Sequence, residues 1–282
     1  MESFLFSLCR LPGVGPVLLL LIVLLPARMA GAAGGGSSAL DLVWAETRIG
    51  LPATITGHLP VFGRVRDRAL ADYLEPGKGQ AGVKVPAVVV LHGCTGIGAE
   101  AESYRFTLPF QGFAVFIPDS FARPGRRPNC NPYRRTTNLA PGVEKLRLEE
   151  VEDLLRRLSA IPWIDQRRLY LIGFSEGGVA AAQYGGHAFR RIVITAWHCH
   201  GRDGARGIAV PPEIPLLTII GENDPWYRSR PGRDCSAFFA GRENARALRL
   251  KGARHALLTS ANGAAADAAR RAIGEFLNAD DE

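Results

Sequence analysis

The chain has 282 residues, of which 47% are hydrophobic and 22% are charged. This composition supports one large folded domain and excludes wholesale disorder. The formal net charge of +7 favours anionic partners, yet no long block of Lys and Arg, zinc-ligand series or RNA-binding motif accompanies it. We therefore expect no nucleic-acid partner, and we interpret the excess charge as solubility plus a few arginine-rich loops.

The N-terminus has the pattern of an export signal. Arg10 precedes an unbroken apolar run from Val17 to Leu25, and Ala30-Gly31-Ala32 fits a small-residue cleavage site. We predict that residues 1–32 are a signal peptide, that residues 33–46 are a flexible linker, and that the mature protein is exported to the periplasm or secreted. The alternative is an uncleaved anchor, in which case the protein would meet the membrane only through this segment.

Four of the five cysteines would remain after cleavage, and an even number in an exported protein favours disulfides. Four thiols allow three pairings, and the sequence does not choose among them. Free buried thiols are the alternative. The four are Cys94, Cys130, Cys199 and Cys235.

Strand and helix patterns alternate from residue 47 to the end of the chain. Residues Thr47 to Val61 are rich in β-branched side chains and broken by Gly and Pro, which predicts antiparallel strands at a sheet edge. Val85 to Leu91 is a continuous apolar run, typical of a strand buried on both faces of a parallel sheet. Further strands are predicted at 113–117, 169–173, 192–197, 214–220 and 247–250, and helices at 101–111, 143–160, 176–184 and 264–277.

This alternation implies right-handed crossovers between parallel strands. We predict an α/β fold with a mostly parallel central sheet and helices on both faces, formed by residues 47–282 as one domain. No internal repeat or second domain is evident.

Ser175 is the centre of a Gly-x-Ser-x-Gly pattern, Gly173 to Gly177. An apolar strand precedes the pattern and a small-residue helix follows it, which is the context of a nucleophile on a sharp strand-to-helix turn. Such a turn is strained, and glycines two residues before and after the serine remove the side chains that would collide. We predict that Ser175 is a catalytic nucleophile. The alternative is an ordinary serine at the start of a glycine-rich helix.

A serine hydroxyl needs a general base, and the base needs a carboxylate that orients it. With this type of turn, the acid and then the histidine follow the nucleophile along the chain. His255 follows the last predicted strand and is the predicted base. Asp224 directly follows the 214–220 strand, where a carboxylate faces the ligand crevice, and is the predicted acid. Asp203 is kept as the second candidate.

The oxyanion formed during acyl transfer needs hydrogen-bond donors. The turn after the Val85–Leu91 strand and the turn at Ser175 each supply one backbone N–H, from Cys94 and from Glu176. Cys94 as the nucleophile is the rival interpretation, but no base is evident for it. His92 is expected to brace the turn.

His198 and His200 flank Cys199 but have no third or fourth ligand nearby in the sequence. We interpret them as loop or pocket-lining residues. We therefore expect neither a metal site nor a cofactor.

These residues resemble the dienelactone hydrolase family of α/β-hydrolases, from about Thr47 to the end of the chain. The resemblance implies the α/β-hydrolase fold and the hydrolysis of an ester or lactone. It is carried by LHGCTG (Leu91 to Gly96), PDSFAR (Pro118 to Arg123), GFSEGG (Gly173 to Gly178), GENDPW (Gly221 to Trp226) and RHAL (Arg254 to Leu257).

Three positions depart from the pattern of the best-known members of the family. Those members have a cysteine at the position of Ser175 and a glutamate at the position of Gly93, which partners that cysteine. The two changes agree, because a serine activated directly by histidine does not need the glutamate. One substrate-binding arginine of the family matches Arg123, whereas the position of the second is Thr259. The resemblance therefore implies that Arg123 binds a substrate carboxylate, and a solvated arginine-rich surface loop is the alternative.

Taken together, the sequence predicts an exported serine hydrolase that cleaves a small carboxylic ester or lactone through an acyl-enzyme intermediate. The substrate would be anionic if Arg123 binds it. One alternative is a peptidase or polyester hydrolase with the same three residues. Another is a non-catalytic relative that binds a small acid or a protein.

Overall fold

The computed structural model describes residues 38–75, 82–131, 134, 136–137, 142–201, 205–227 and 233–279. The predicted signal peptide, 1–32, lies outside the described residues. Within the described part of the chain, no helix is long and apolar enough to cross a bilayer.

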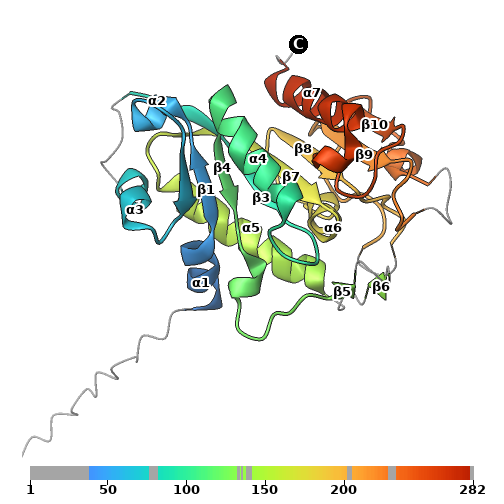
Figure 1. Ribbon diagram of the computed structural model, residues 1–282, viewed down its shortest axis with the longest axis horizontal. Helices are drawn as coiled ribbons and strands as arrows, with labels where there is room; N and C mark the ends of the chain where they lie inside the picture. The colour runs from blue at the N-terminus through green and yellow to red at the C-terminus, as the bar shows by residue number, and fades with distance from the viewer. Residues whose placement is uncertain are drawn as a thin grey trace, which may run out of the picture. The chain divides into compact units, whose positions relative to one another are not determined.

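The centre of the fold is an eight-stranded sheet (Figure 1). Its strands are β1 (Arg48–Leu51), β2 (Val61–Arg64), β3 (Val85–Leu91), β4 (Ala114–Ile117), β7 (Ile164–Phe174), β8 (Arg191–Thr195), β9 (Leu216–Gly221) and β10 (Ala245–Leu250). The spatial order is β10-β9-β8-β7-β3-β4-β1-β2. Neighbours are parallel from β10 to β4 and antiparallel from β4 through β1 to β2. This confirms the predicted mostly parallel sheet. The edge formed by β1 and β2 is antiparallel as predicted, but the predicted range 47–61 holds β1 and a short helix at Ala53–Thr56, and β2 only begins at its last residue.

Helices cover both faces of this sheet. They are α1 (Ala39–Glu46), α2 (Ala53–Thr56), α3 (Arg68–Leu74), α4 (Ala99–Thr107), α5 (Val143–Ser159), α6 (Glu176–Ala182) and α7 (Ala264–Asn278). A second, two-stranded antiparallel sheet pairs β5 (Cys130–Asn131) with β6 (Thr136–Thr137).

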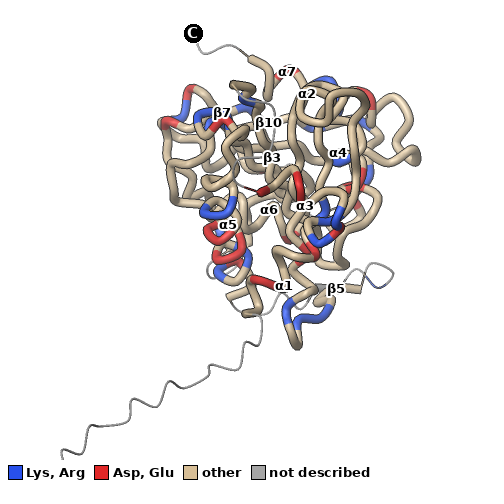
Figure 2. Tube along the Cα trace, turned by 90° about the vertical axis from the view of Figure 1, so that its left-hand side faces the viewer, with Lys and Arg blue, Asp and Glu red and all other residues tan. Residues whose placement is uncertain are grey.

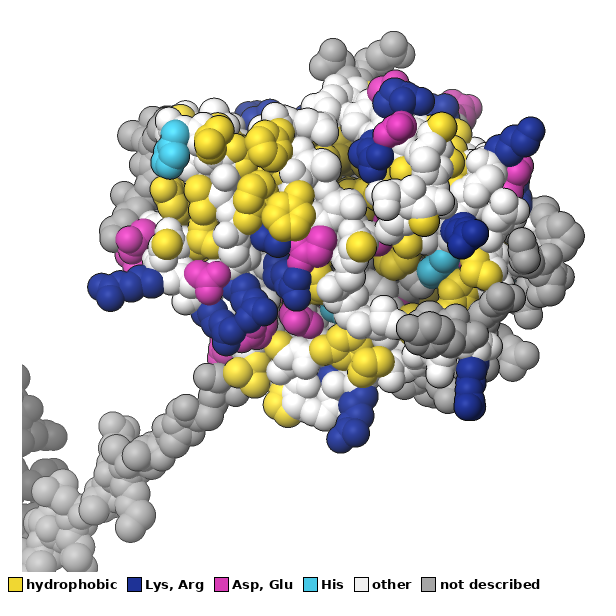
Figure 3. Space-filling view, viewed as in Figure 1, with side chains coloured by type: hydrophobic (Ala, Val, Ile, Leu, Met, Phe, Trp, Pro, Cys, Tyr) yellow, Lys and Arg dark blue, Asp and Glu magenta, His cyan; other side chains and the backbone are white. Residues whose placement is uncertain are grey.

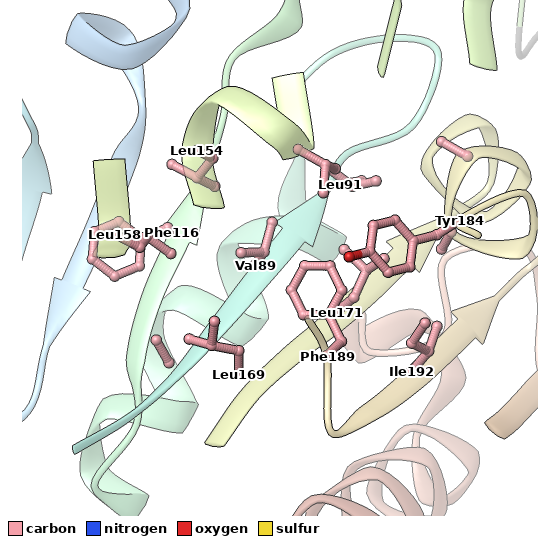
Figure 4. Close-up of a cluster of buried hydrophobic side chains, with 14 of the residues drawn as sticks. Val89, Leu91, Phe116, Leu154, Leu158, Leu169, Leu171, Tyr184, Phe189 and Ile192 are labelled. Carbon is pink, nitrogen blue, oxygen red and sulfur yellow. The ribbon is translucent and has the colours of Figure 1, made fainter. Parts of the chain in front are cut away.

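Successive side chains of the central strands point to opposite faces of the sheet, so each face has its own hydrophobic cluster. Val89 and Leu91 of β3 belong to the cluster under α5 and α6, where Figure 4 shows them near Leu154 of α5. Val88 and Val90 belong to the other cluster, under α4 and α7. Burial on both faces explains why β3 is apolar at every position.

A flexible linker was predicted at residues 33–46, but its last eight residues form the helix α1. The side chain of Ser38 accepts a hydrogen bond from the N–H of Asp41, and the Asp41 carboxylate accepts one from the N–H of Ser38. This capping box fixes the start of the helix. Val43 is buried and the Trp44 ring stacks on Phe116, with ring centroids 6.5 Å apart. Residues 33–37 of the predicted linker lie outside the described residues.

Two disulfides form, Cys94–Cys130 and Cys199–Cys235. The sequence left the pairing open, and the structure selects one of the three alternatives. Cys199 and Cys235 are fully buried in the hydrophobic cluster under α5 and α6. Cys94 and Cys130 are half-buried and lie at the carboxyl ends of the strands.

Large apolar side chains are also exposed near the antiparallel edge of the sheet. Leu59, Phe106 and Phe110 belong to this group, and hydrophobic side chains gather on this part of the surface in Figure 3. The Phe106 ring packs on Phe62 of β2, with ring centroids 5.0 Å apart.

Candidate active site

The turn between β7 and α6 holds Ser175 in a strained conformation, with φ 55° and ψ −110°. The turn leaves no room for side chains at the flanking glycines. A Cβ at Gly173 would lie 2.3 Å from the Gly177 carbonyl oxygen, and a Cβ at Gly177 would lie 2.1 Å from the Leu91 carbonyl oxygen. The two glycines therefore permit the close approach of α6 to the sheet, as the sequence pattern predicted.

The structure brings Ser175, His255 and Asp224 together. Nε2 of His255 lies 2.9 Å from Oγ of Ser175, and Nδ1 of His255 lies 2.7 Å from Oδ2 of Asp224. The backbone N–H of Trp226 donates to the other Asp224 oxygen at 2.9 Å. The Asp224 carboxylate is buried, so its charge is held close to the imidazole with little solvent screening. Asp203, the second candidate for the acid, lies outside the described residues.

The loop that carries His255 is tied down on both sides of the histidine. Oδ1 of Asn262 accepts a hydrogen bond from the N–H of Arg254 at 2.8 Å. Oε2 of Glu100, from α4, accepts one from the N–H of Leu258 at 2.7 Å. Burial raises the pKa of the Glu100 carboxyl to about 8, because the charged form loses its hydration.

The two predicted oxyanion donors come from adjacent strands. Cys94 lies in the Gly93–Gly96 turn after β3 and lines the same pocket as Ser175. Glu176 is the first residue of α6, and a first-turn N–H has no acceptor within its own helix. Because β3 and β7 are paired in the sheet, both turns are at its carboxyl edge.

His92 braces the turn after β3, as expected. Its ring is fully buried, with Nδ1 2.8 Å from the Gly93 carbonyl oxygen, and the N–H of Ser120 donates to Nε2 at 3.1 Å. These two contacts select the neutral tautomer with a proton on Nδ1. Burial, followed by the nearby Arg147 charge, holds the pKa of His92 well below its usual range.

A pocket of about 330 Å³ opens beside Ser175. Its lining comes from the turns after β3, β7, β9 and β10, from Cys130 and from the start of α4. Cys94 and Cys130 also line it, so their disulfide forms part of the wall. None of the described residues that line it is Lys or Arg. The apolar side chains include Phe174, Pro225, Trp226, Ala256 and Ala101.

The structure places Arg123 outside the lining of this pocket, whereas the resemblance implies that it binds a substrate carboxylate. Nε of Arg123 donates to Oε1 of Glu150 at 2.9 Å, and its Nη2 donates to Oε2 of Glu149 at 3.2 Å and to the Leu146 carbonyl at 3.3 Å. All three acceptors belong to α5. A guanidinium held by two carboxylates on the helix is not presented to a ligand at Ser175. Thr259, at the position of the family's second arginine, does line the pocket.

A group of buried and partly buried charged side chains lies behind the Ser175 turn, and of these side chains the sequence singled out only Arg123. We call it the ion network and define it as Arg123, Arg126, Arg147, Glu150 and Glu176. Arg147 and Glu150 lie on α5, whose acidic and basic positions are visible in Figure 2. The available signal was their position, because Val143, Arg147, Glu150 and Leu154 share one helix face, and that face is buried.

His198 and His200 lie together at the Cys199–Cys235 disulfide. The N–H of His200 donates to Nδ1 of His198 at 3.0 Å. Cys199 is committed to its disulfide. Among the described residues, no group of three or more His, Cys, Asp and Glu side chains is arranged to hold a metal ion.

Comparisons with known proteins show which solved structures have a similar fold. A candidate dienelactone hydrolase from Klebsiella pneumoniae subsp. pneumoniae superposes with a TM-score of 0.54 at 18% identity, over 71% of this chain and 90% of that chain. A dienelactone hydrolase-like promiscuous phosphotriesterase from metagenomic libraries gives 0.52 at 18% identity, over 70% and 87%. Est1E from Butyrivibrio proteoclasticus, with ferulic acid bound, gives 0.51 at 14% identity, over 69% and 88%.

These similarities establish the α/β-hydrolase fold. A search of curated protein sequences found no match. A profile of the dienelactone hydrolase family, however, matches residues 73–279, which contain the Ser175 turn, Asp224 and His255. The chain therefore belongs to the dienelactone hydrolase family of carboxylic-ester hydrolases.

Proposed function

We propose that the protein is an exported serine hydrolase that cleaves a small, uncharged carboxylic ester or lactone, with Ser175, His255 and Asp224 as its catalytic residues. The observation that carries the proposal is the pair of contacts at His255, 2.9 Å to Ser175 Oγ and 2.7 Å to Asp224 Oδ2. A base within hydrogen-bonding distance of a hydroxyl, itself oriented by a buried carboxylate, is the arrangement that activates serine.

In the proposed mechanism, Oγ of Ser175 attacks the ester carbonyl while Nε2 of His255 takes its proton. Asp224 stabilises the imidazolium through Nδ1. The N–H groups of Cys94 and Glu176 donate to the oxyanion of the tetrahedral intermediate. His255 then protonates the leaving alcohol, which leaves an acyl group on Ser175. Water attacks this acyl-enzyme with His255 as the base, and collapse of the second tetrahedral intermediate releases the acid and the free serine.

The pocket supports an uncharged substrate. Its described lining holds apolar side chains such as Phe174 and Trp226 and no cation, so a substrate carboxylate would be desolvated there without a partner. A volume of about 330 Å³ is at the small end of ligand pockets. We therefore propose a small acyl group rather than a polymer or peptide substrate.

Export is supported by two observations that are independent of the triad. The N-terminal segment has the pattern of a signal peptide. The chain also forms two disulfides, and disulfides persist mainly in oxidising compartments. Mass measurement of the protein recovered from the periplasm or medium of an expressing bacterium tests this part. Loss of residues 1–32 is expected, and a full-length protein retained with the cells would contradict it.

Covalent labelling by a fluorophosphonate probe tests the catalytic assignment. The wild-type protein should label, and Ser175→Ala should not, with a loss of esterase kcat/KM of at least about 10⁴-fold. Ser159→Ala, at an exposed position of α5, is the matched control and should label normally. Labelling that survives Ser175→Ala would identify a different nucleophile. A wild-type protein that fails to label beside an active control esterase would instead favour a non-catalytic relative.

p-Nitrophenyl esters of graded acyl length, each paired with a carboxylate-bearing analogue, test the substrate class. The uncharged short-chain esters should give the highest kcat/KM. Faster hydrolysis of the carboxylate-bearing esters, or of peptide or polyester substrates, would contradict the proposed substrate.

A further inference from the structure

Arg147 lies at the centre of the ion network, behind the two turns that carry the predicted oxyanion donors. Its side chain is fully buried. Nη1 donates to the His92 carbonyl oxygen at 3.2 Å and lies 3.4 Å from Oε1 of Glu176, and Nε lies 3.1 Å from Oε2 of Glu150. One nitrogen of one guanidinium therefore contacts both the turn after β3 and the turn after β7.

Each contact lies close to an oxyanion donor. His92 is two residues before Cys94, and Glu176 itself carries the second N–H. The pairing of β3 with β7 ends at Leu91 and Gly173, so beyond that point the sheet no longer fixes the distance between the turns. Arg147 ties them together at this point.

The position of Arg147 is fixed in turn by α5. Glu150, one turn further along the helix, pairs with it and also accepts hydrogen bonds from Ser120 at 2.8 Å and from Arg123 at 2.9 Å. Arg126 forms a second ion pair with Glu176. Three guanidinium groups thus face the two buried carboxylates, and the exposed Glu149 carboxylate also pairs with Arg123.

We propose that Arg147 is a positioning residue, which holds the N–H groups of Cys94 and Glu176 at the separation that the oxyanion requires. The proposal rests on the proposed function, because it assumes that these groups bind an oxyanion. Both donors must lie about 2.7–3.1 Å from one oxygen, so a small shift of either turn weakens the interaction. A planar guanidinium with several fixed donors suits this role, whereas an ammonium group reaches fewer acceptors at once.

A positioning role predicts a particular kinetic pattern. Arg147→Lys keeps the positive charge but shortens the reach and loses the fork of donors. We expect kcat to fall by about tenfold or more, because a displaced donor forfeits part of the 10²–10³-fold that loss of an oxyanion donor costs. KM should stay within about twofold of the wild-type value, since the pocket walls are unchanged.

The experiment measures kcat, KM and the inhibition constant of a trifluoromethyl ketone for wild type, Arg147→Lys and Arg147→Met. The ketone forms a tetrahedral adduct with the nucleophile, so its inhibition constant should rise by the same factor as kcat/KM falls. Arg156→Met is the matched control, because Arg156 lies on the same helix but is exposed and pairs only with Asp153 among the described residues. It should leave all three quantities unchanged.

Thermal unfolding of each variant separates positioning from folding. Arg147→Met leaves the buried carboxylates that contact Arg147 without this counter-charge, so this variant is the more prone to unfold. If it does unfold, the kinetics of Arg147→Lys provide the test. Equal kcat in folded Arg147→Lys and wild type would overturn the proposal, as would a rise in KM with kcat unchanged. An inhibition constant that stays constant while kcat falls would overturn it too. A wild-type protein without esterase activity or probe labelling would instead refute the proposed function.

Discussion

The two faces of the sheet place different buried charged groups near the candidate site. On the face covered by α5 and α6, the ion network pairs buried carboxylates with arginines. On the face covered by α4 and α7, Glu100 is buried, and no cation among the described residues lies within ion-pairing distance of it. Each side supports a different loop of the candidate site, because Glu176 follows Ser175 and carries a proposed oxyanion donor, whereas Glu100 binds the N–H of Leu258 in the loop of His255.

The difference shows two ways of burying an acid beside an active site. A buried carboxylate needs counter-charges and hydrogen bonds to keep its charge. The ion network supplies them, although burial still raises the pKa of the Glu150 carboxyl above its usual value. Glu100 has no ion pair with the residues that the structure describes, and desolvation raises its pKa to about 8, so this carboxyl is mostly protonated at neutral pH. One loop is therefore supported by charge and the other by a hydrogen bond to a mostly neutral acid.

The largest predicted effect on stability is on the charged face. Glu150→Leu removes a fully buried carboxylate and leaves Arg147 and Arg123 without their shared partner. We expect the free energy of unfolding to fall by about 3–5 kcal/mol, the usual cost of breaking a buried ion pair from one side. Urea denaturation measures it.

Glu149→Leu is the matched control for this substitution. Glu149 is the neighbouring residue and also pairs with Arg123, but its side chain is 63% exposed. It should cost less than about 1 kcal/mol. Equal losses for the two variants would mean that the ion network contributes no more to stability than a surface pair.

The two disulfides provide the next comparison, because each closes a loop with a sequence separation of 36. Loop-closure entropy predicts a similar loss of about 4 kcal/mol for each double serine variant. Their effects on activity should differ. Cys94→Ser/Cys130→Ser loosens a turn that carries a proposed oxyanion donor and a wall of the pocket, so kcat/KM should fall by about tenfold.

Cys199→Ser/Cys235→Ser should leave kcat/KM within about threefold of wild type below its unfolding temperature, because this disulfide lies in the hydrophobic cluster and not in the pocket wall. Thermal unfolding and ester hydrolysis at a temperature where both variants are folded measure the two effects. If only Cys199→Ser/Cys235→Ser lost activity, the predicted difference between the two disulfides would be wrong.

The sequence predicted best those features that are set by residues close together along the chain. β3 matches its predicted bounds because a strand buried on both faces is a continuous apolar run. Ser175 was identified because its turn imposes glycines at fixed positions. The short helices α2 and α3 were missed, since four to seven residues give too little periodicity to separate a helix from a loop.

Side-chain partners were the part that the sequence did not determine. In the sequence, Arg147 and Glu150 look like ordinary charges of an amphipathic helix. They become a buried pair because α5 packs against the Ser175 turn. The same is true of Arg123, whose match to a family position does not specify which carboxylate it meets. The three-dimensional packing decides both.

Glu100, on the face covered by α4 and α7, gives a prediction of how stability depends on pH. The pKa of Glu100 is about 8 in the folded protein against an ordinary value of 4.5, so between these values the folded state binds the proton more tightly than the unfolded state. The wild-type protein therefore loses stability as pH rises through this range. Glu100→Gln keeps an acceptor for Leu258 but does not titrate.

The stability of Glu100→Gln relative to wild type should therefore increase from pH 5 to pH 9, by at least about 1.4 kcal/mol, the equivalent of one pKa unit. Urea denaturation at the two pH values measures it. Glu275→Gln, at an exposed position of α7, is the control. A constant difference between Glu100→Gln and wild type across this range would show that Glu100 is already charged in the folded state.

The smallest expected effect concerns substrate charge at Arg123. Its guanidinium is held by Glu149 and Glu150 and is absent from the pocket lining. Arg123→Met should therefore change kcat/KM for an uncharged ester and for its carboxylate-bearing analogue by the same factor, within about twofold, with any common decrease arising through the ion network. A guanidinium that did bind the substrate would contribute a charge-assisted hydrogen bond of about 1.5–3 kcal/mol to the anionic ester alone. Paired measurements on the two esters distinguish the cases, since a selective loss of tenfold or more for the anionic ester would return Arg123 to the site.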